Sequence, residues 1–285
     1  MRFFPAWLLA PCALSGAVVG ASSDSVLEVD LVFPRNESYA PTDRFPIVFA
    51  FQNAQKAKYL NPYIDYTIWS WANLPGNDNL GWSHDLRTVN WSSTHDAYFV
   101  YNFFSERDLP EGQWKMVWSV SWQSCNETAL SHQLDPRGMV YNDTSRGISF
   151  TINKSAPKVD LVSATANKTT CSPEGASDLE TGVAIPINVT GKTMEVPYWV
   201  DWPGGDTCAV VASSIPTPTV DPCRVKIDSA IEASMSASLT AKQCRGLNPP
   251  PDCPEDDEGA AQKLVVVGVS TLLSAVGALG FFLSL

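Results

Sequence analysis

Residues 114–122 read WKMVWSVSW, and this stretch decides the fold class of the chain. Its alternate positions carry the large apolar side chains of Trp114, Met116, Trp118, Val120 and Trp122. The positions between them include Lys115, Ser119 and Ser121. A period of two is typical of a β-strand that buries one face in a core and turns the other toward solvent. We therefore predict a strand here, with its tryptophans packed in the core.

Earlier segments repeat this period. FPIVFAFQN, residues 45–53, places its aromatic side chains on one face. YIDYTIWSW, residues 63–71, places Ile64, Tyr66 and Ile68 on one face and Tyr63, Trp69 and Trp71 on the other. Six or seven such strands, separated by turn-forming stretches, predict an all-β domain over residues 22–155, an immunoglobulin- or fibronectin-like antiparallel β-sandwich. Because no cysteine lies between Val26 and Ser124, aromatic packing must replace an inter-sheet disulfide between early and late strands.

Residues 156–245 have a different composition, with fewer tryptophans and most of the cysteines. Five segments there predict strands: VAIPINVTG (183–191), VPYWVDW (196–202), CAVVAS (208–213), CRVKIDSA (223–230) and MSASLTAKQC (235–244). We expect a second, smaller β-domain stapled by disulfides. Residues 246–263 are rich in proline and acidic side chains, which indicates an extended stalk.

The two ends of the chain predict a secretory route. Arg2 precedes an apolar run that ends in small residues, so residues 1–21 are interpreted as a signal peptide cleaved after Ala21. Residues 264–285 carry no charge and are long enough to span a bilayer as a helix. This tail is either a single-pass anchor or the signal for a GPI lipid attached near Gly259. No Lys or Arg follows it, which favours the lipid anchor.

An oxidising compartment makes the cysteines and sequons informative. Six cysteines remain after residue 21, and they predict up to three disulfides with fifteen possible connectivities. They are Cys125, Cys171, Cys208, Cys223, Cys244 and Cys253. N-glycosylation is predicted at seven Asn-x-Ser/Thr sequons: Asn36, Asn90, Asn126, Asn142, Asn153, Asn167 and Asn188. The formal net charge of −11 argues against a nucleic-acid partner bound through a basic patch.

Three stretches together resemble a known family. They are FPRNESYAPTDRFPIVFAFQN (residues 33–53), WSVSW (118–122) and GGDTC (204–208). As a set they are similar to a fungal family of secreted proteins that carry a domain of unknown function, over roughly residues 25–245. The resemblance implies a fungal, extracellular or wall-associated address. It implies no reaction and no catalytic residues.

Motifs for catalysis were sought along the chain. No Gly-x-Ser-x-Gly elbow, phosphate-binding loop or zinc-protease motif occurs, so we assign no catalytic residue, cofactor or metal. Two alternatives stay open. His84-Asp85 and His95-Asp96 would form a metal site if a hairpin brought them together. Glycoside hydrolysis needs a pair of carboxylates, for which Asp65, Asp85, Glu106, Asp108 and Glu111 are candidates.

The remaining functional signal is aromatic. Tyr63, Trp69 and Trp71 lie on the face opposite Ile64, Tyr66 and Ile68, so they are a candidate ligand platform if that face is exposed. Such a strip would stack sugar rings or bind another surface protein. We therefore expect a non-enzymatic, structural or adhesive glycoprotein on the extracellular face of the plasma membrane or in the cell wall. Its partner would be wall polysaccharide or a surface protein, with the tail in the membrane. The alternative is a carbohydrate-binding module or an extracellular glycan-active enzyme.

Overall fold

The computed structural model describes residues 26–73, 79–93, 96–126, 139–166, 183–198, 205–212, 220–246 and 253. Several predictions fall outside these ranges: the signal peptide, the tail with Gly259, nearly all of the stalk, Asn167 and Cys171. No helix within the described ranges is long and apolar enough to cross a bilayer.

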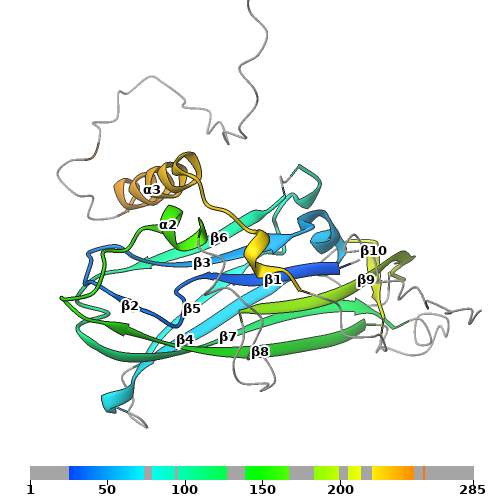
Figure 1. The fold of residues 1–285 in the computed structure, drawn as a ribbon. Helices are drawn as coiled ribbons and strands as arrows, with labels where there is room; N and C mark the ends of the chain where they lie inside the picture. The colour runs from blue at the N-terminus through cyan, green and yellow to red at the C-terminus, as the bar shows by residue number, and fades with distance from the viewer. Residues whose placement is uncertain are drawn as a thin grey trace, which may run out of the picture.

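The fold is mostly β and consists of two five-stranded sheets (Figure 1). The first sheet has the order β10-β9-β1-β3-β6 and is antiparallel throughout. Its strands are β10 (Thr207–Val211), β9 (Ala184–Glu195), β1 (Val26–Phe33), β3 (Phe45–Gln52) and β6 (Tyr98–Phe104).

The second sheet has the order β2-β8-β7-β4-β5. Its strands are β2 (Ser38–Tyr39), β8 (Met139–Ile152), β7 (Gly112–Cys125), β4 (Tyr63–Ser70) and β5 (Asn79–Asp85). The short β2 runs parallel to β8, and the other pairs are antiparallel. The all-β prediction is therefore confirmed at the level of two β-sheets.

Within the described residues, the α-helices are α2 (Leu161–Ala166) and α3 (Ser229–Cys244), and both lie on the side of the first sheet (Figure 1). The 3-10 helices there are η2 (Ala54–Tyr59), η3 (Trp71–Asn73), η4 (Trp91–Ser93) and η5 (Pro222–Arg224). Two of these elements, η3 and η5, shape the surfaces discussed below.

Aromatic side chains join the two sheets at the centre of the core. Phe49 of β3 lies 5.6 Å from Tyr66 of β4 and 5.4 Å from Trp118 of β7, measured between ring centroids. All three side chains are almost fully buried. The five alternating apolar residues of segment 114–122 are buried as predicted. Tilted aromatic contacts of this kind supply the inter-sheet cohesion for which this part of the chain has no cysteine pair.

Strand pairing crosses the boundary that we expected at residue 155. β9 lies beside β1, with Leu27 opposite Ile187 and Val29 opposite Ile185, so residues 184–211 extend the first sheet. A disulfide joins Cys125, at the end of β7, to Cys208 of β10. The C-terminal strands thus complete a sheet that the N-terminal strands begin.

Two of the predicted strands are wrong. MSASLTAKQC lies inside helix α3, and CRVKIDSA contains the turn η5 and the start of that helix. The apolar alternation of Met235, Ala237 and Leu239 suggested a strand, but Ala-rich sequence favours a helix. Asp228 caps the helix, because its side chain accepts a hydrogen bond of 2.8 Å from the backbone N–H of Ile231.

Disulfides are present as predicted. Besides Cys125–Cys208, a disulfide joins Cys244, the last residue of α3, to Cys253. Cys223 is also disulfide-bonded. The second bridge ties the end of α3 to Cys253, within the predicted stalk.

Candidate functional site

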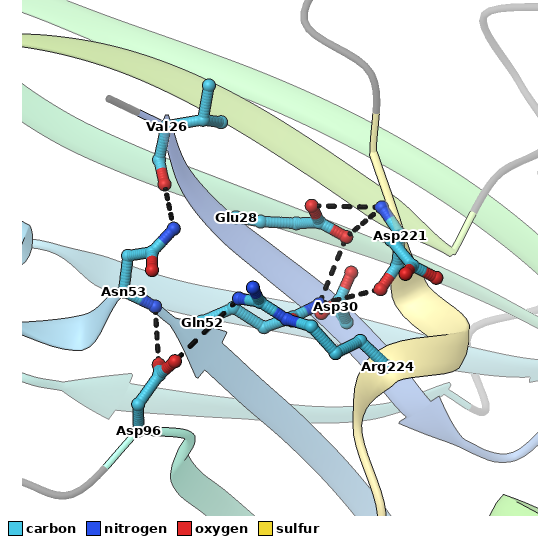
Figure 2. A network of polar contacts seen from close by, with 8 residues as sticks. All are labelled: Val26, Glu28, Asp30, Gln52, Asn53, Asp96, Asp221 and Arg224. Atoms are coloured by element: carbon cyan, nitrogen blue, oxygen red, sulfur yellow. Dashed lines mark hydrogen bonds and ion pairs between the residues drawn. The ribbon is translucent and has the colours of Figure 1, made fainter. Parts of the chain in front are cut away.

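The protein has two polar surfaces that are candidate sites, one on the outer side of each sheet. On the first sheet, Glu28 and Asp30 of β1 point away from the core, because they alternate with Leu27, Val29 and Leu31. Both are nevertheless buried, with 7 % and 0 % of their surfaces exposed. The segment that carries η5 covers them (Figure 2).

Gln52 of β3 connects the two carboxyl groups to this covering segment. Its Nε2 donates hydrogen bonds to Oε1 of Glu28 at 3.1 Å, to Oδ2 of Asp30 at 2.7 Å and to the carbonyl oxygen of Asp221 at 2.9 Å (Figure 2). The backbone N–H of Asp221 donates to both carboxylate oxygens of Glu28, at 2.9 and 3.1 Å. The side chain of Arg224 donates to Oε1 of Gln52.

The cluster continues to a neighbouring loop. Arg224 Nη2 lies 3.7 Å from Oδ2 of Asp96, whose other oxygen accepts a hydrogen bond from the backbone N–H of Asn53. Asn53 Nδ2 donates to the carbonyl oxygen of Val26 at 2.7 Å. One polar network thus joins β1, the end of β3, the loop at Asp96 and the segment of η5 (Figure 2).

Burial changes the protonation of these acids. Burial, followed by the neighbouring Glu28 carboxyl, raises the pKa of Asp30 well above its usual range. Burial also raises the pKa of Glu28. Asp30 Oδ1 and the Nε and Nη1 atoms of buried Arg35 have no hydrogen-bond partner in the described structure. Glu28, Asp30 and Gln52, at the centre of the network, are buried. We therefore interpret the network as a structural contact that holds the segment of η5 on the first sheet, and not as a ligand site.

The outer face of the second sheet is exposed in part: Asp65 and Asp143 are exposed, whereas Ser121 is buried. On β4, Ile64, Tyr66 and Ile68 are buried, as one face of the predicted strand should be, and Asp65 on the other face is exposed. The β4 residues of this outer face are Tyr63, Asp65, Thr67 and Trp69. Opposite them stand Asp85, Ser83, Gly81 and Asn79 of β5, and Ser121, Ser119, Val117 and Lys115 of β7. Asp143, Ser145, Gly147 and Ser149 of β8 continue the same four rows.

One end of this face is aromatic. Trp71 in η3, directly after β4, is 47 % exposed, and Trp69 is half-buried in the row beside it. Lys115 Nζ lies 5.9 Å from the ring centroid of Trp71. Tyr63 is at the opposite end of β4, about 20 Å from Trp69 at 3.3 Å per residue. The structure therefore places Trp69 and Trp71 together and separates Tyr63 from them.

The other end of the face is acidic and rich in hydroxyl groups. Ser119 donates a hydrogen bond to Asp65, and the Oγ atoms of Ser119 and Ser145 lie 2.8 Å apart. Burial, followed by the charge of Asp143, raises the pKa of Asp65. Between the acidic and aromatic ends runs a row that contains Gly81 and Gly147, so no side chain rises from two of its four positions.

The other acids suggested by the sequence have different partners. Asp85 forms an ion pair with Arg87, whose hydrogen bonds lower the pKa of Asp85 to about 2. Glu111 pairs with Lys154 at 2.7 Å, and Asp108 accepts hydrogen bonds from Ser105. The charge of Glu106 acts on Lys154, the partner of Glu111. Asp65 and Asp85 share this face with a third carboxylate, that of Asp143 on β8. Sequence reasoning missed Asp143 because only the pairing of β8 with β7 brings it near β4.

The histidines do not assemble a metal site in the described residues. His84 lies on the inner side of β5, where its ring stacks on Tyr66 at 6.0 Å. Burial lowers its pKa to about 4. His95 and His132 lie outside the described residues. Within the described ranges, no group of three or more His, Cys, Asp or Glu residues could hold a metal ion.

The sequons occupy different positions. Asn36, Asn90 and Asn153 are exposed, whereas Asn126, Asn142 and Asn188 are half-buried. Asn142 Nδ2 donates a hydrogen bond of 3.2 Å to Ser124 Oγ, and Asn188 lies in β9 between β1 and β10. Exposure at the first three makes them the better acceptors. Their glycosylation stays a prediction.

Comparison with known proteins gives one match. A family model described as a domain of unknown function, DUF7136, matches residues 22–253. A search of curated proteins and a search of solved structures found no match. The match covers both of the segments that the sequence suggested were separate domains.

Proposed function

The chain thus belongs to the DUF7136 family, and from that premise we propose that it is a non-enzymatic, adhesive surface glycoprotein that binds polysaccharide. The binding surface is the outer face of the second sheet. The observation that carries this proposal is the half-exposed Trp71 beside Trp69, at the end of a long polar face. Large exposed aromatic side chains on a soluble domain commonly mark interaction sites.

The chemistry of the face suits a sugar chain. A pyranose ring presents C–H groups that pack against the flat face of an indole, and its hydroxyl groups need hydrogen-bond partners. Ser119, Ser145 and Asp65 supply such partners in a single row, two rows from that of Trp69. Above Gly81, which is exposed, an added side chain would meet nothing within 4 Å, so a ligand could approach the strand closely there.

A glycan-active enzyme is the second candidate, and the Asp65–Asp143 pair is the observation that favours it. Most glycoside hydrolases use a pair of carboxyl groups. This pair, however, lies on an open sheet face, whereas catalysis benefits from a site that excludes water. Release of reducing sugar from a bound polysaccharide, lost in Asp65→Asn, would favour the enzyme over the binding protein.

The proposal includes the cellular location of the protein. The predicted signal peptide, the sequons and the disulfides support passage through the secretory pathway. The uncharged segment 264–285 supports membrane attachment, as a helix or through a lipid near Gly259. The family resemblance supports a fungal origin and a place at the plasma membrane or in the cell wall.

An immunoglobulin-like architecture is also proposed. The order β1-β3-β6 matches strands A, B and E of that fold, and β8-β7-β4-β5 matches G, F, C and C′. Phe49 on β3 and Trp118 on β7 would then stand near the positions of the B–F disulfide. β9 and β10 are additions on the free edge of β1. Sandwiches of this type commonly occur in surface recognition, which supports the proposal by analogy alone.

The test is binding of the full-length protein, produced in a secretory eukaryotic host, to an array of wall polysaccharides. Trp71→Ala should lower the affinity for the bound glycan at least tenfold, about 1.4 kcal/mol, because it removes the exposed stacking surface. Trp82→Ala is the matched control, since Trp82 is 42 % exposed but lies on the inner side of β5. No binding by folded wild-type protein, or equal loss in both variants, would refute the proposal.

A further inference from the structure

The C-terminal end of α3 is joined to the proposed membrane attachment by a short tether. Cys244, the last residue of α3, is disulfide-bonded to Cys253, with 5.5 Å between the two Cα atoms. Gly259 lies six positions after Cys253, and Leu264 lies eleven positions after it. A fully extended chain spans at most about 3.6 Å per residue, so the attachment point lies within roughly 20 to 40 Å of Cys253. The proposed attachment therefore holds this end of α3 near the bilayer.

An exposed tryptophan and two basic residues lie together at this end of α3. Trp82 of β5 is 42 % exposed, and Lys242 Nζ lies 5.5 Å from its ring centroid. Arg245, the residue after α3, is exposed, and its Nε donates a hydrogen bond of 3.1 Å to the carbonyl oxygen of Ala241. Neither Lys242 nor Arg245 forms an ion pair within the described part of the chain. Tryptophan is enriched at membrane–water interfaces, where lysine and arginine bury their aliphatic stems and keep their charged ends among the headgroups.

The proposed glycan-binding face points the other way. α3 lies on the side of the first sheet, whereas the glycan-binding face is the outer side of the second sheet (Figure 1). On β5 itself, Trp82 lies on the inner side, and its neighbours Gly81 and Ser83 lie on the outer side. Contact of Trp82 with a bilayer would therefore leave Trp71 accessible to a polysaccharide on the side away from the membrane.

The charge of the tether indicates which kind of bilayer fits. Residues 255–258, between Cys253 and Gly259, are all acidic. An anionic bilayer would repel these carboxylates next to the attachment point. A zwitterionic bilayer has no net charge to repel them, and its phosphate groups can still accept hydrogen bonds from Lys242 and Arg245. Charge complementarity therefore favours zwitterionic phospholipids.

We propose that Trp82, Lys242 and Arg245 form a docking surface for a zwitterionic phospholipid bilayer, on which the protein rests with its glycan-binding face outward. This inference rests on the membrane attachment in the proposed function and adds the orientation of the molecule on the membrane. One aromatic and two basic side chains make a weak contact by themselves. The short tether makes that contact sufficient, because a linker of this length keeps the surface at an effective concentration on the order of millimolar.

The first readout is lysine labelling of protein that is purified with its membrane attachment from a secretory eukaryotic host and reconstituted into phosphatidylcholine vesicles. A membrane-impermeant amine reagent modifies exposed lysines, and mass spectrometry gives the rates at Lys242 and Lys115. The comparison is a variant with about twenty Gly and Ser residues inserted between residues 258 and 259. Effective concentration falls roughly as the −3/2 power of tether length, so the insertion should speed labelling of Lys242 about three- to ninefold. Labelling of Lys115 should stay unchanged, since Lys115 lies beside Trp71 on the opposite face.

The second readout is quenching of tryptophan fluorescence by brominated phosphatidylcholine in the vesicles. Trp82→Phe should lose about half or more of the quenching seen in the wild type, because it removes the indole that enters the headgroup region. Trp71→Phe is the matched control and should change nothing, although Trp71 is similarly exposed and also lies beside a lysine. Vesicles rich in phosphatidylserine should give weaker quenching than vesicles of phosphatidylcholine alone.

The outcomes separate this inference from the proposed function. Equal labelling of Lys242 at both tether lengths, with quenching unchanged in Trp82→Phe, would overturn the docking surface and leave the membrane attachment in place. Protein that is not retained on membranes would overturn the attachment and this inference together. Neither result bears on glycan binding, which Trp71→Ala tests on the polysaccharide array. Quenching lost in Trp71→Phe instead of Trp82→Phe would place the glycan-binding face on the membrane and overturn the inference.

Discussion

At the scale of single residues, Asp30 is an acid that faces away from the core and is nevertheless buried. Its place in β1 turns it away from the core, yet the segment of η5 buries it beside Glu28. Ionising both of these neighbouring carboxyl groups in a buried site is energetically unfavourable, because the two charges repel each other and neither is solvated by water. Burial and the neighbouring Glu28 carboxyl raise the pKa of Asp30 and so favour its protonated form, in which the carbonyl oxygen can still accept the hydrogen bond from Gln52.

A pH dependence of stability follows from this protonation. The pKa of Asp30 is raised in the folded state, so its stabilising contribution is complete below about pH 4 and is lost as the pH rises through the folded-state pKa. Asp30→Asn keeps a neutral group at every pH and should raise the melting temperature more at pH 7 than at pH 4. Thermal unfolding at both pH values measures this. A shift of the same size at both would contradict the assignment, and Asp43→Asn is the control.

At the scale of elements, the Cys125–Cys208 and Cys244–Cys253 disulfides constrain very different lengths of chain. Cys125–Cys208 joins the two sheets across 83 residues, whereas Cys244–Cys253 closes a loop of 9 residues at the end of α3. Loop-closure entropy alone predicts a cost of about 4.5 kcal/mol for losing the first and about 2.6 kcal/mol for losing the second. Paired Cys→Ser variants, compared by denaturant unfolding, check this order. A larger loss from the Cys244–Cys253 pair would contradict it.

The alternation of apolar and polar residues correctly predicted strands where the strand buries one face. The alternation in β4 and β7 identified both the core face and the face that holds Trp69, because period two reports burial directly. The same period misled at Met235, where helix propensity and the cap at Asp228 prevail. The sequence could not predict that Asp143 and Asp65 share one sheet face, because this depends on β8 pairing with β7 and on no feature of either segment alone.

At the scale of the whole molecule, the pairing of β9 with β1 makes β9 and β10 part of the sandwich. Composition suggested a second domain, because cysteine and tryptophan are unevenly distributed along the chain. Composition does not specify which edge a strand will join. β9 has apolar residues at alternate positions, Ile185, Ile187 and Val189, and all three are buried. β9 pairs with the edge of β1 that β3 leaves free. β10 pairs with the other edge of β9, and the Cys125–Cys208 disulfide links β10 to β7.

The shared sheet predicts how the protein unfolds. If β1 depends on β9 for one of its two ladders, residues 22–155 alone should expose that ladder and the outward side chains Glu28 and Asp30, which the segment of η5 covers. Calorimetry of the intact protein should show one cooperative transition. The 22–155 fragment should melt at least 10 °C lower or aggregate, since it loses several buried side chains at about 1 kcal/mol or more each. Two separable transitions in the intact protein, one reproduced by the fragment, would instead establish independent domains.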